Sequence, residues 1–119
     1  MASDTRLTTG SVGERAALDA YRNLGYRLVA RNWRCGLGEL DLIVTRGDVL
    51  VFCEVKTRRG PAFGGGYEAV TWRKREKLRS LAEAFLQERG WRANAIRFDV
   101  ASVALGPRGP HVELFEDAF

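Results

Sequence analysis

The chain has 119 residues, of which 45% are hydrophobic, and a net charge of +4. This size predicts one domain with a genuine core and excludes a core plus a separate module. No apolar run approaches a membrane span, and Cys35 and Cys53 are too few for a disulfide framework, so we expect a cytoplasmic protein that does not enter a membrane.

A polar segment precedes the first predicted helix. Residues 1–10 lack the apolar core of a signal peptide and are expected to form a flexible tail. The folded domain should therefore comprise residues 11–119. Its first element is predicted to be a helix from Ser11 to about Leu24, with Gly25 as its stop.

Glu14 has two open interpretations. Ser11 and Glu14 have the spacing of a capping box, in which the acid interacts with the backbone at the helix start. At about 100° per residue, Glu14 also lies on the side of Leu18 and Tyr21, which is the side expected to face a sheet. Because the two roles do not exclude each other, Glu14 is a candidate acid for a site on the sheet.

Three strands are predicted after this helix. Tyr26–Arg34 alternates in polarity and should form the first. Leu40–Val44 and Val49–Val55 are rich in β-branched and apolar residues, and the short segment between them contains Gly47 and Asp48. This pattern predicts a β-hairpin with a two-residue turn.

The register of this hairpin decides which side chains face each other. With a two-residue turn, paired residue numbers sum to 95, which places Asp41 opposite Glu54 and Glu39 opposite Lys56. The two-residue period of a strand then puts all four side chains on one face. A three-residue loop would instead place Asp41 opposite Cys53 and turn it away from Glu54.

Two facing carboxylates favour a cation between them, because like charges about 5 Å apart repel. Mg²⁺ or Mn²⁺ takes oxygen ligands from one or two carboxylates and completes its shell with water and phosphate oxygens. Asp41 and Glu54 supply that minimum, and Lys56 could place a positive charge near the attacking water or the phosphorus centre. The residues thus predict a metal site for phosphodiesters, with a solvated or salt-bridged strand face as the open alternative.

Positive charge is concentrated in the middle of the chain. Residues 54–79 contain eight Lys or Arg and three Glu, whereas the last ten residues carry a charge of −3. A basic segment beside an acidic strand face suits a polyanion with an embedded metal, although an Arg-rich soluble surface would look the same. Thr57–Gly66, which includes Arg58 and Arg59, is glycine-rich and is predicted to be a mobile loop.

The second predicted helix starts at the N-cap Thr71 and runs to about Arg89, with Gly90 after its end. Its first turn contains Arg73, Lys74 and Arg75. Positive charge is unfavourable at the positive end of the helix dipole, and a bound phosphate would reverse the sign of that effect. Cations that simply point to water are the open alternative.

Two more strands are predicted near the end of the chain. Ile96–Val100 and His111–Phe115 flank a turn at Gly106–Pro110. His111 is the only histidine and is predicted to lie on the surface, with no partner set for zinc.

The order of these elements, together with Glu14, Asp41, Glu54 and Lys56, resembles the restriction-endonuclease-like superfamily, whose core motif is Asp followed by Glu-x-Lys. More closely, the chain is similar to the YraN-like family of bacterial proteins, which is similar in turn to archaeal Holliday junction resolvases. The stretches that carry this resemblance are Gly13-Glu14, Asn32–Arg34, Gly38–Ile43, Phe52–Arg58, Lys74 and Phe98–Val100.

The resemblance implies an α/β fold with a restriction-endonuclease-like core, in which a mixed central sheet in the order αβββαβ, with a C-terminal strand, is flanked by helices. It implies Glu14, Asp41, Glu54 and the Val55 carbonyl as metal ligands and Lys56 as the catalytic lysine. Resolvases of this type act as dimers, so a homodimer is also implied. The chain has Leu40 where the superfamily often has proline.

Three hypotheses follow. The first is a Mg²⁺- or Mn²⁺-dependent nuclease that acts on branched or single-stranded nucleic acid, with DNA favoured over RNA as the substrate. Its phosphate-binding residues would be Arg58, Arg59, Arg73 and Lys74. The second is a non-catalytic nucleic-acid-binding protein that keeps the nuclease fold, and the third is a protein-interaction domain.

Overall fold

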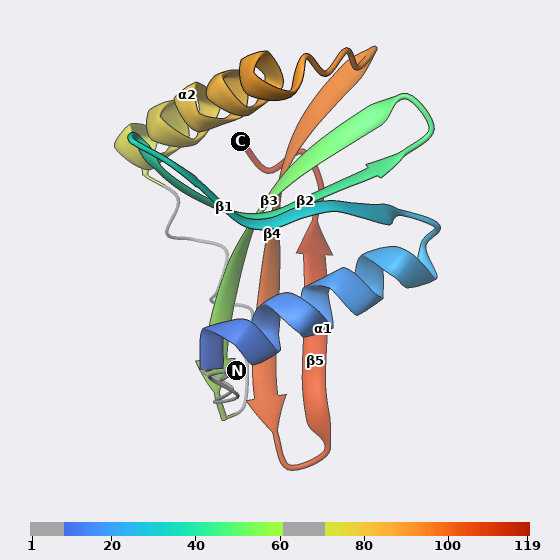
Figure 1. Ribbon diagram of the computed structural model, residues 1–119. Coiled ribbons are helices and arrows are strands. Elements are labelled where there is room, and N and C mark those ends of the chain that lie inside the picture. The colour runs from blue at the N-terminus through green and yellow to red at the C-terminus, as the bar shows by residue number, and fades with distance from the viewer. Residues whose placement is uncertain (1–8, 61–70) are drawn as a thin grey trace, which may run out of the picture.

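The computed structural model describes residues 9–60 and 71–119. They form an α/β fold with two helices and five strands, as predicted (Figure 1). In chain order the elements are α1 (Thr9–Asn23), β1 (Arg27–Cys35), β2 (Gly38–Arg46), β3 (Val49–Arg59), α2 (Trp72–Arg89), β4 (Ala95–Gly106) and β5 (Gly109–Phe115).

The strands form one mixed sheet in the order β1-β2-β3-β4-β5. Neighbouring strands are antiparallel except for β3 and β4, which are parallel. A parallel pair requires a crossover connection, and α2 lies in that connection. The predicted mixed sheet with helices around it is therefore confirmed.

The two helices pack on separate hydrophobic clusters. Because side chains alternate along a strand, Leu42 and Val51 point to the cluster that contains Tyr21 of α1. Ile43 and Phe52 belong to the cluster around α2. By the same alternation, Asp41 and Glu54 lie on the α2 side of the sheet.

The predicted register of the β2–β3 hairpin is confirmed from Arg46↔Val49 to Leu42↔Cys53. Gly47 in the turn has φ 58°, which suits a primed turn. The predicted continuation to Asp41–Glu54 and Glu39–Lys56 is wrong, because the described ladder ends at Leu42.

Where this ladder ends, a side-chain oxygen takes the place of a backbone carbonyl as the hydrogen-bond acceptor. In the same register the Val55 N–H would donate to the carbonyl of Leu40, but it donates to Asp41 Oδ2 at 2.9 Å. Leu40 instead remains paired with Trp33 of β1. β2 thus follows β1 away from β3, and the acids face an opening between strands rather than a closed ladder.

The start of α1 differs from the prediction. The helix begins at Thr9, so Ser11 and Glu14 lie inside it and the capping-box interpretation is wrong. Thr9 and Gly10, which were assigned to the predicted tail, belong to the helix. The rest of that tail, residues 1–8, lies outside the described residues.

The end of β3 also differs. Pairing with β4 continues to Arg59↔Leu105, so residues 57–59 are a strand and not the start of a loop. Backbone hydrogen bonds to the neighbouring strand outweigh the local glycine-rich composition here. The remainder of the predicted loop, residues 61–66, lies outside the described residues.

Both ends of α2 are as predicted. The Thr71 side chain accepts a hydrogen bond from the Lys74 N–H, and Gly90 is left-handed with φ 59°. Neither of the helices in the described ranges has the length and apolar character needed to cross a bilayer.

Candidate functional site

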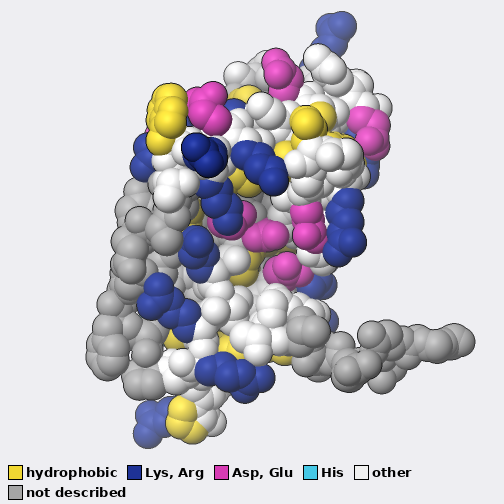
Figure 2. Space-filling view, turned by 90° about the vertical axis from the view of Figure 1, so that its left-hand side faces the viewer, with side chains coloured by type: hydrophobic (Ala, Val, Ile, Leu, Met, Phe, Trp, Pro, Cys, Tyr) yellow, Lys and Arg dark blue, Asp and Glu magenta, His cyan; other side chains and the backbone are white. Residues whose placement is uncertain are grey.

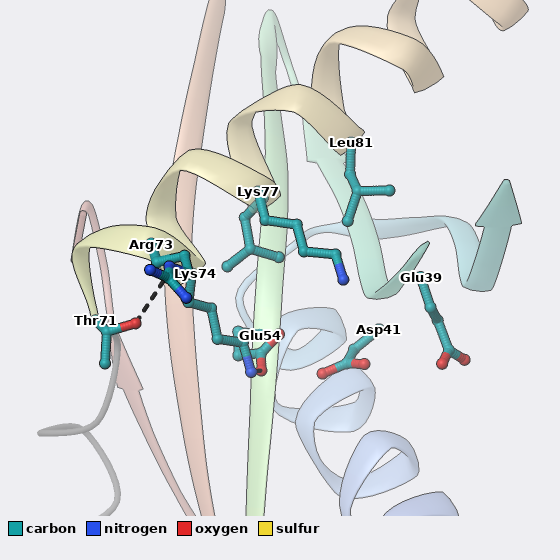
Figure 3. Close-up of a pocket in the computed structure, with 9 residues that line it drawn as sticks. Glu39, Asp41, Glu54, Thr71, Arg73, Lys74, Lys77 and Leu81 are labelled. Atoms are coloured by element: carbon teal, nitrogen blue, oxygen red, sulfur yellow. Dashed lines mark hydrogen bonds and ion pairs between the residues drawn. The ribbon is translucent and has the colours of Figure 1, made fainter. Parts of the chain in front are cut away.

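A pocket of about 480 Å³ opens between the first turns of α2 and strands β2 and β3. Figure 2 shows this side of the molecule, where acidic side chains gather in a hollow beside a run of Lys and Arg. The lining residues are Glu39, Asp41, Glu54, Thr71, Arg73, Lys74, Lys77, Leu78 and Leu81. In the close-up of Figure 3 the three acids lie in a row below α2, with Glu54 nearest to the start of the helix and Glu39 farthest from it.

Asp41 is the most perturbed acid of the pocket. Burial, followed by the charge of Glu54, raises the pKa of Asp41 to about 7, and the hydrogen bond from the Val55 N–H opposes this shift. Glu14 and Glu39 raise the pKa further. Burial and the neighbouring carboxylates thus disfavour the ionised form of Asp41, and a bound cation would stabilise that form.

Glu54 already has a cationic partner. Lys74 Nζ lies 2.5 Å from Glu54 Oε2, and the Glu54 side chain is only 11% exposed. Figure 3 shows Lys74 reaching down from the first turn of α2 to this carboxylate. The pair neutralises one acid, and among residues 9–60 and 71–119 the neighbouring Asp41 has no ion pair of this kind.

The pocket brings together four of the predicted site residues, namely Asp41, Glu54, Arg73 and Lys74. Lys56 shares a strand face with Glu54 by the two-residue period, but it is not among the pocket-lining residues. The lysine beside Glu54 is instead Lys74, although sequence spacing alone points to Lys56.

Arg58 and Arg59 also lie outside the pocket lining, near the end of β3. Arg59 Nε donates to Thr9 Oγ1 at 3.1 Å, which ties the end of β3 to the start of α1. Val55 contributes its N–H to Asp41, whereas its carbonyl is the group that was predicted as a ligand.

Glu14 belongs to the helix on the opposite side of the sheet. Its Oε1 accepts a hydrogen bond from Asn32 Nδ2 at 3.0 Å and lies 3.6 Å from Arg31 Nη2. Asn32 is held at φ 51°, a left-handed conformation that asparagine tolerates better than most residues. Glu14 thus influences Asp41 electrostatically but is not one of the acids that line the pocket.

A two-carboxylate Mg²⁺ site fits these residues better than a cage of protein ligands. Within residues 9–60 and 71–119, no group of three or more His, Cys, Asp or Glu side chains is placed to hold a metal ion. Mg²⁺ needs only one or two carboxylates when water and substrate phosphate supply the other oxygens. Asp41 and Glu54 satisfy that requirement, and the raised pKa of Asp41 means that a cation beside it would favour its ionised form.

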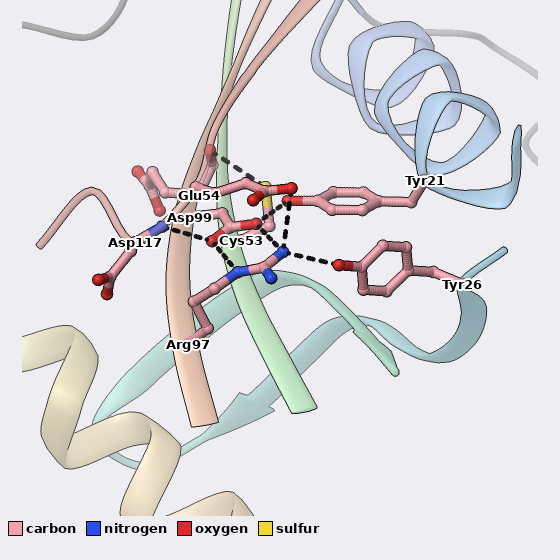
Figure 4. Close-up of polar contacts among 8 residues, drawn as sticks. Tyr21, Tyr26, Cys53, Glu54, Arg97, Asp99 and Asp117 are labelled. Atoms are coloured by element: carbon pink, nitrogen blue, oxygen red, sulfur yellow. Dashed lines mark hydrogen bonds and ion pairs between the residues drawn. The ribbon is translucent and has the colours of Figure 1, made fainter. Parts of the chain in front are cut away.

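The sequence did not reveal two features of this region. Lys77 lines the pocket one helical turn after Arg73, a position that helix periodicity could have indicated. The second is a buried polar cluster of Tyr21, Arg97 and Asp99, shown in Figure 4, in which Asp99 pairs with Cys53 of β3. Its partners come from distant parts of the chain, so no local pattern signals it.

The fold and pocket together define an α/β protein with a mixed five-stranded sheet and a charged pocket where α2 begins. The model of the uncharacterised protein family UPF0102 matches residues 13–103. The chain belongs to this family, which confirms the YraN-like part of the resemblance.

Relatives of nearly equal length share more than two fifths of the sequence. A UPF0102 protein of Pelotomaculum thermopropionicum is 44% identical, and the match covers 98% of this chain and 99% of the relative. A UPF0102 protein of Mycolicibacterium gilvum is 45% identical, and the match covers 93% of this chain and 95% of the relative. A UPF0102 protein of Moorella thermoacetica is 43% identical, and the match covers 97% of this chain and 98% of the relative.

Proposed function

We propose that the protein is a Mg²⁺- or Mn²⁺-dependent nuclease with a restriction-endonuclease-like core that hydrolyses phosphodiester bonds in branched or single-stranded DNA. The observation that carries this proposal is the convergence of Asp41 and Glu54 with the cations of α2 in one pocket. Carboxylates recruit a divalent metal and cations recruit phosphate, and phosphoryl chemistry needs both at one place.

Each group in the pocket has a distinct task in this proposal. Asp41 and Glu54 would hold the metal, which when bound would polarise the phosphodiester and lower the pKa of a bound water. Arg73 and Lys77 would hold phosphate oxygens from α2. The Val55 N–H fixes the Asp41 carboxylate, so its orientation is set before any ligand arrives.

Lys74 has two tasks in succession. It neutralises Glu54, as their ion pair indicates. Once Glu54 is used by a metal, the same ammonium can turn to a phosphate oxygen of the substrate, because Lys side chains are flexible point charges. Lys56 remains the alternative candidate for the lysine that acts on the reacting phosphate.

The test is cleavage by the purified full-length chain on branched, flapped, single-stranded and duplex DNA in Mn²⁺. We expect Asp41→Asn and Glu54→Gln each to lower the rate at least about 100-fold, because each removes charge needed in the transition state. Glu39→Gln is the matched control, since Glu39 lines the same pocket but pairs with Arg34 at 3.3 Å. Cleavage retained in Asp41→Asn would reject the proposal.

The second candidate function is nucleic-acid binding without catalysis. It is favoured by the ion pair between Lys74 and Glu54, because a site that supplies its own cation does not require a metal. It predicts salt-sensitive binding that persists in chelator, with no cleavage of any substrate in the panel.

A further inference from the structure

Trp72, the first residue of α2, is 73% exposed and is the most exposed large hydrophobic side chain among the described residues. A single exposed apolar residue is normal on a protein surface and carries little information alone. Its position is informative here. The chain neighbours of Trp72 are Thr71 and Arg73, and both line the pocket with Asp41 and Glu54.

The charge around Trp72 limits the kind of partner that can cover it. Residues 72–79 contain five Lys or Arg and one Glu, and the first turn of α2 has no acidic residue. Cations at a helix N-terminus are unfavourable unless an anion is nearby. A partner for this surface should therefore bring negative charge together with an apolar face.

An unpaired nucleotide has both properties. Its phosphate is anionic, and its base has a flat face that stacks on aromatic side chains. In a duplex these faces are covered by neighbouring bases, so an indole on the surface cannot reach them. A protein partner would have to place an acidic and an apolar group at one spot, whereas every nucleotide of a single strand does so.

We propose that Trp72 is a stacking platform for an unpaired base, with the adjoining phosphates held by Arg73 and the other cations of the pocket. This inference rests on the proposed function, because it names the form of nucleic acid that the site accepts. Stacking at a residue whose chain neighbours Thr71 and Arg73 line the pocket would direct the strand toward Asp41 and Glu54. The platform selects unpaired segments, whether of DNA or RNA, since the base face is common to both.

The experiment measures binding of the full-length chain in EDTA, so that cleavage plays no part. Labelled oligo(dT) and oligo(U) of about 12 nucleotides, close to the site size of single-strand binders, are compared with a duplex of equal length by fluorescence anisotropy. We expect Trp72→Ala to weaken single-strand binding about tenfold and to leave duplex binding unchanged. Trp72→Phe should retain most of the affinity, because a phenyl ring also stacks.

Leu24→Ala is the matched control, since Leu24 is 49% exposed but follows α1 rather than preceding the pocket. It should bind like the unchanged protein. Equal single-strand affinity of Trp72→Ala and the unchanged protein would overturn the stacking proposal, and so would an equal loss for duplex and single strand.

Cleavage in Mn²⁺, measured on the same proteins, separates this inference from the nuclease proposal. A protein that cleaves but shows no dependence on Trp72 rejects stacking and leaves the nuclease function standing. One that binds single strands through Trp72 without cleaving them supports stacking and rejects catalysis. Absence of binding to every oligonucleotide, together with absence of cleavage in Mn²⁺, rejects both.

Discussion

At the scale of single residues, Asp41 carries a conflict between stability and the proposed function. Burial and the nearby charge of Glu54 raise its pKa to about 7, so the folded protein holds this proton more tightly than the unfolded chain does. Proton binding that is stronger in the folded state makes stability fall as pH rises. The loss of stability caused by ionising Asp41 is absent below about pH 4 and complete above about pH 7.

Asp41→Asn should therefore stabilise the metal-free protein at pH 8 by about 1 to 3 kcal/mol and have little effect near pH 4. The amide oxygen of asparagine can still accept the Val55 N–H, so the change removes the charge and keeps the hydrogen bond. Urea unfolding in EDTA at the two pH values measures the difference. The prediction fails if the stability gain is the same at both.

The same comparison in Mg²⁺ tests the link to the proposed metal site. A ligand that binds only the folded state stabilises it by mass action. The unchanged protein should gain stability in Mg²⁺ at pH 8, and Asp41→Asn should gain less. Glu39→Gln should gain about as much stability in Mg²⁺ as the unchanged protein, because Glu39 pairs with Arg34 and is not one of the proposed metal ligands.

The sequence predicted the acids of the site but not all of their partners. The strand period placed Asp41 and Glu54 on one face, and the pocket contains both. The approach of Lys74 to Glu54 is a contact between a helix and a strand, and its geometry depends on how α2 packs on the sheet. From the sequence alone, the two-residue period of a strand was the only way to predict which lysine lies beside Glu54, and that period favoured Lys56.

At the scale of elements, α1 packs unusually close to β3. A Cβ built on Gly13 would lie 1.8 Å from Thr57 Oγ1, so only a residue without a side chain allows the helix to sit this near the strand. Because Gly13 directly precedes Glu14, this close approach also fixes the distance between Glu14 and the sheet.

Gly13→Ala should lower the free energy of unfolding by about 1 to 2 kcal/mol. Alanine favours a helix by up to about 1 kcal/mol, but overpacking a tight contact costs about 1 to 3 kcal/mol. Thermal unfolding provides the measurement, and Thr57→Ala in the Gly13→Ala background should recover part of the loss. Gly36→Ala is the control, because a Cβ there meets nothing within 4 Å. A stabilising effect of Gly13→Ala would contradict the close packing.

The ends of helices and strands were predictable where local sequence signals and tertiary packing favour the same boundary. The Thr71 cap and the Gly90 stop are local signals, and both ends of α2 follow them. The end of β3 is not local, because pairing with β4 extends the strand through Arg59 despite glycines nearby in the sequence. The start of α1 likewise precedes its apparent capping box.

At the scale of the whole molecule, one buried carboxylate joins segments from both ends of the chain. Asp99 of β4 accepts a hydrogen bond from Tyr21 of α1 at 2.6 Å, two from Arg97 at 2.9 Å and one from the Asp117 N–H at 3.0 Å (Figure 4). Arg97 also donates to Tyr26 at 3.0 Å. This network is a tertiary feature, and the sequence showed Asp99 only as a polar residue within a strand and as part of a stretch that carries the family resemblance.

The protonation states of the network favour its hydrogen bonds. Burial and the neighbouring charges keep the pKa of Tyr21 well above its usual value, so the phenol stays protonated and donates. The hydrogen bonds to Asp99 raise the pKa of Arg97 above its usual range. Tyr21 and Arg97 therefore both keep the protons that they donate to Asp99.

Asp99→Asn should destabilise the protein by about 3 to 5 kcal/mol, because the partly buried charge of Arg97 loses its main partner. In addition, the NH2 group of the asparagine side chain would face hydrogen-bond donors instead of accepting from them. Tyr21→Phe removes a single hydrogen bond and should cost about 1 to 2 kcal/mol. Urea unfolding of both variants and of the double variant gives the coupling between them. Since the phenol donates directly to the carboxylate, we expect the double variant to lose less than the two single losses added together. Strict additivity would show that the two side chains act independently and that α1 and the C-terminal segment are not held by one shared group.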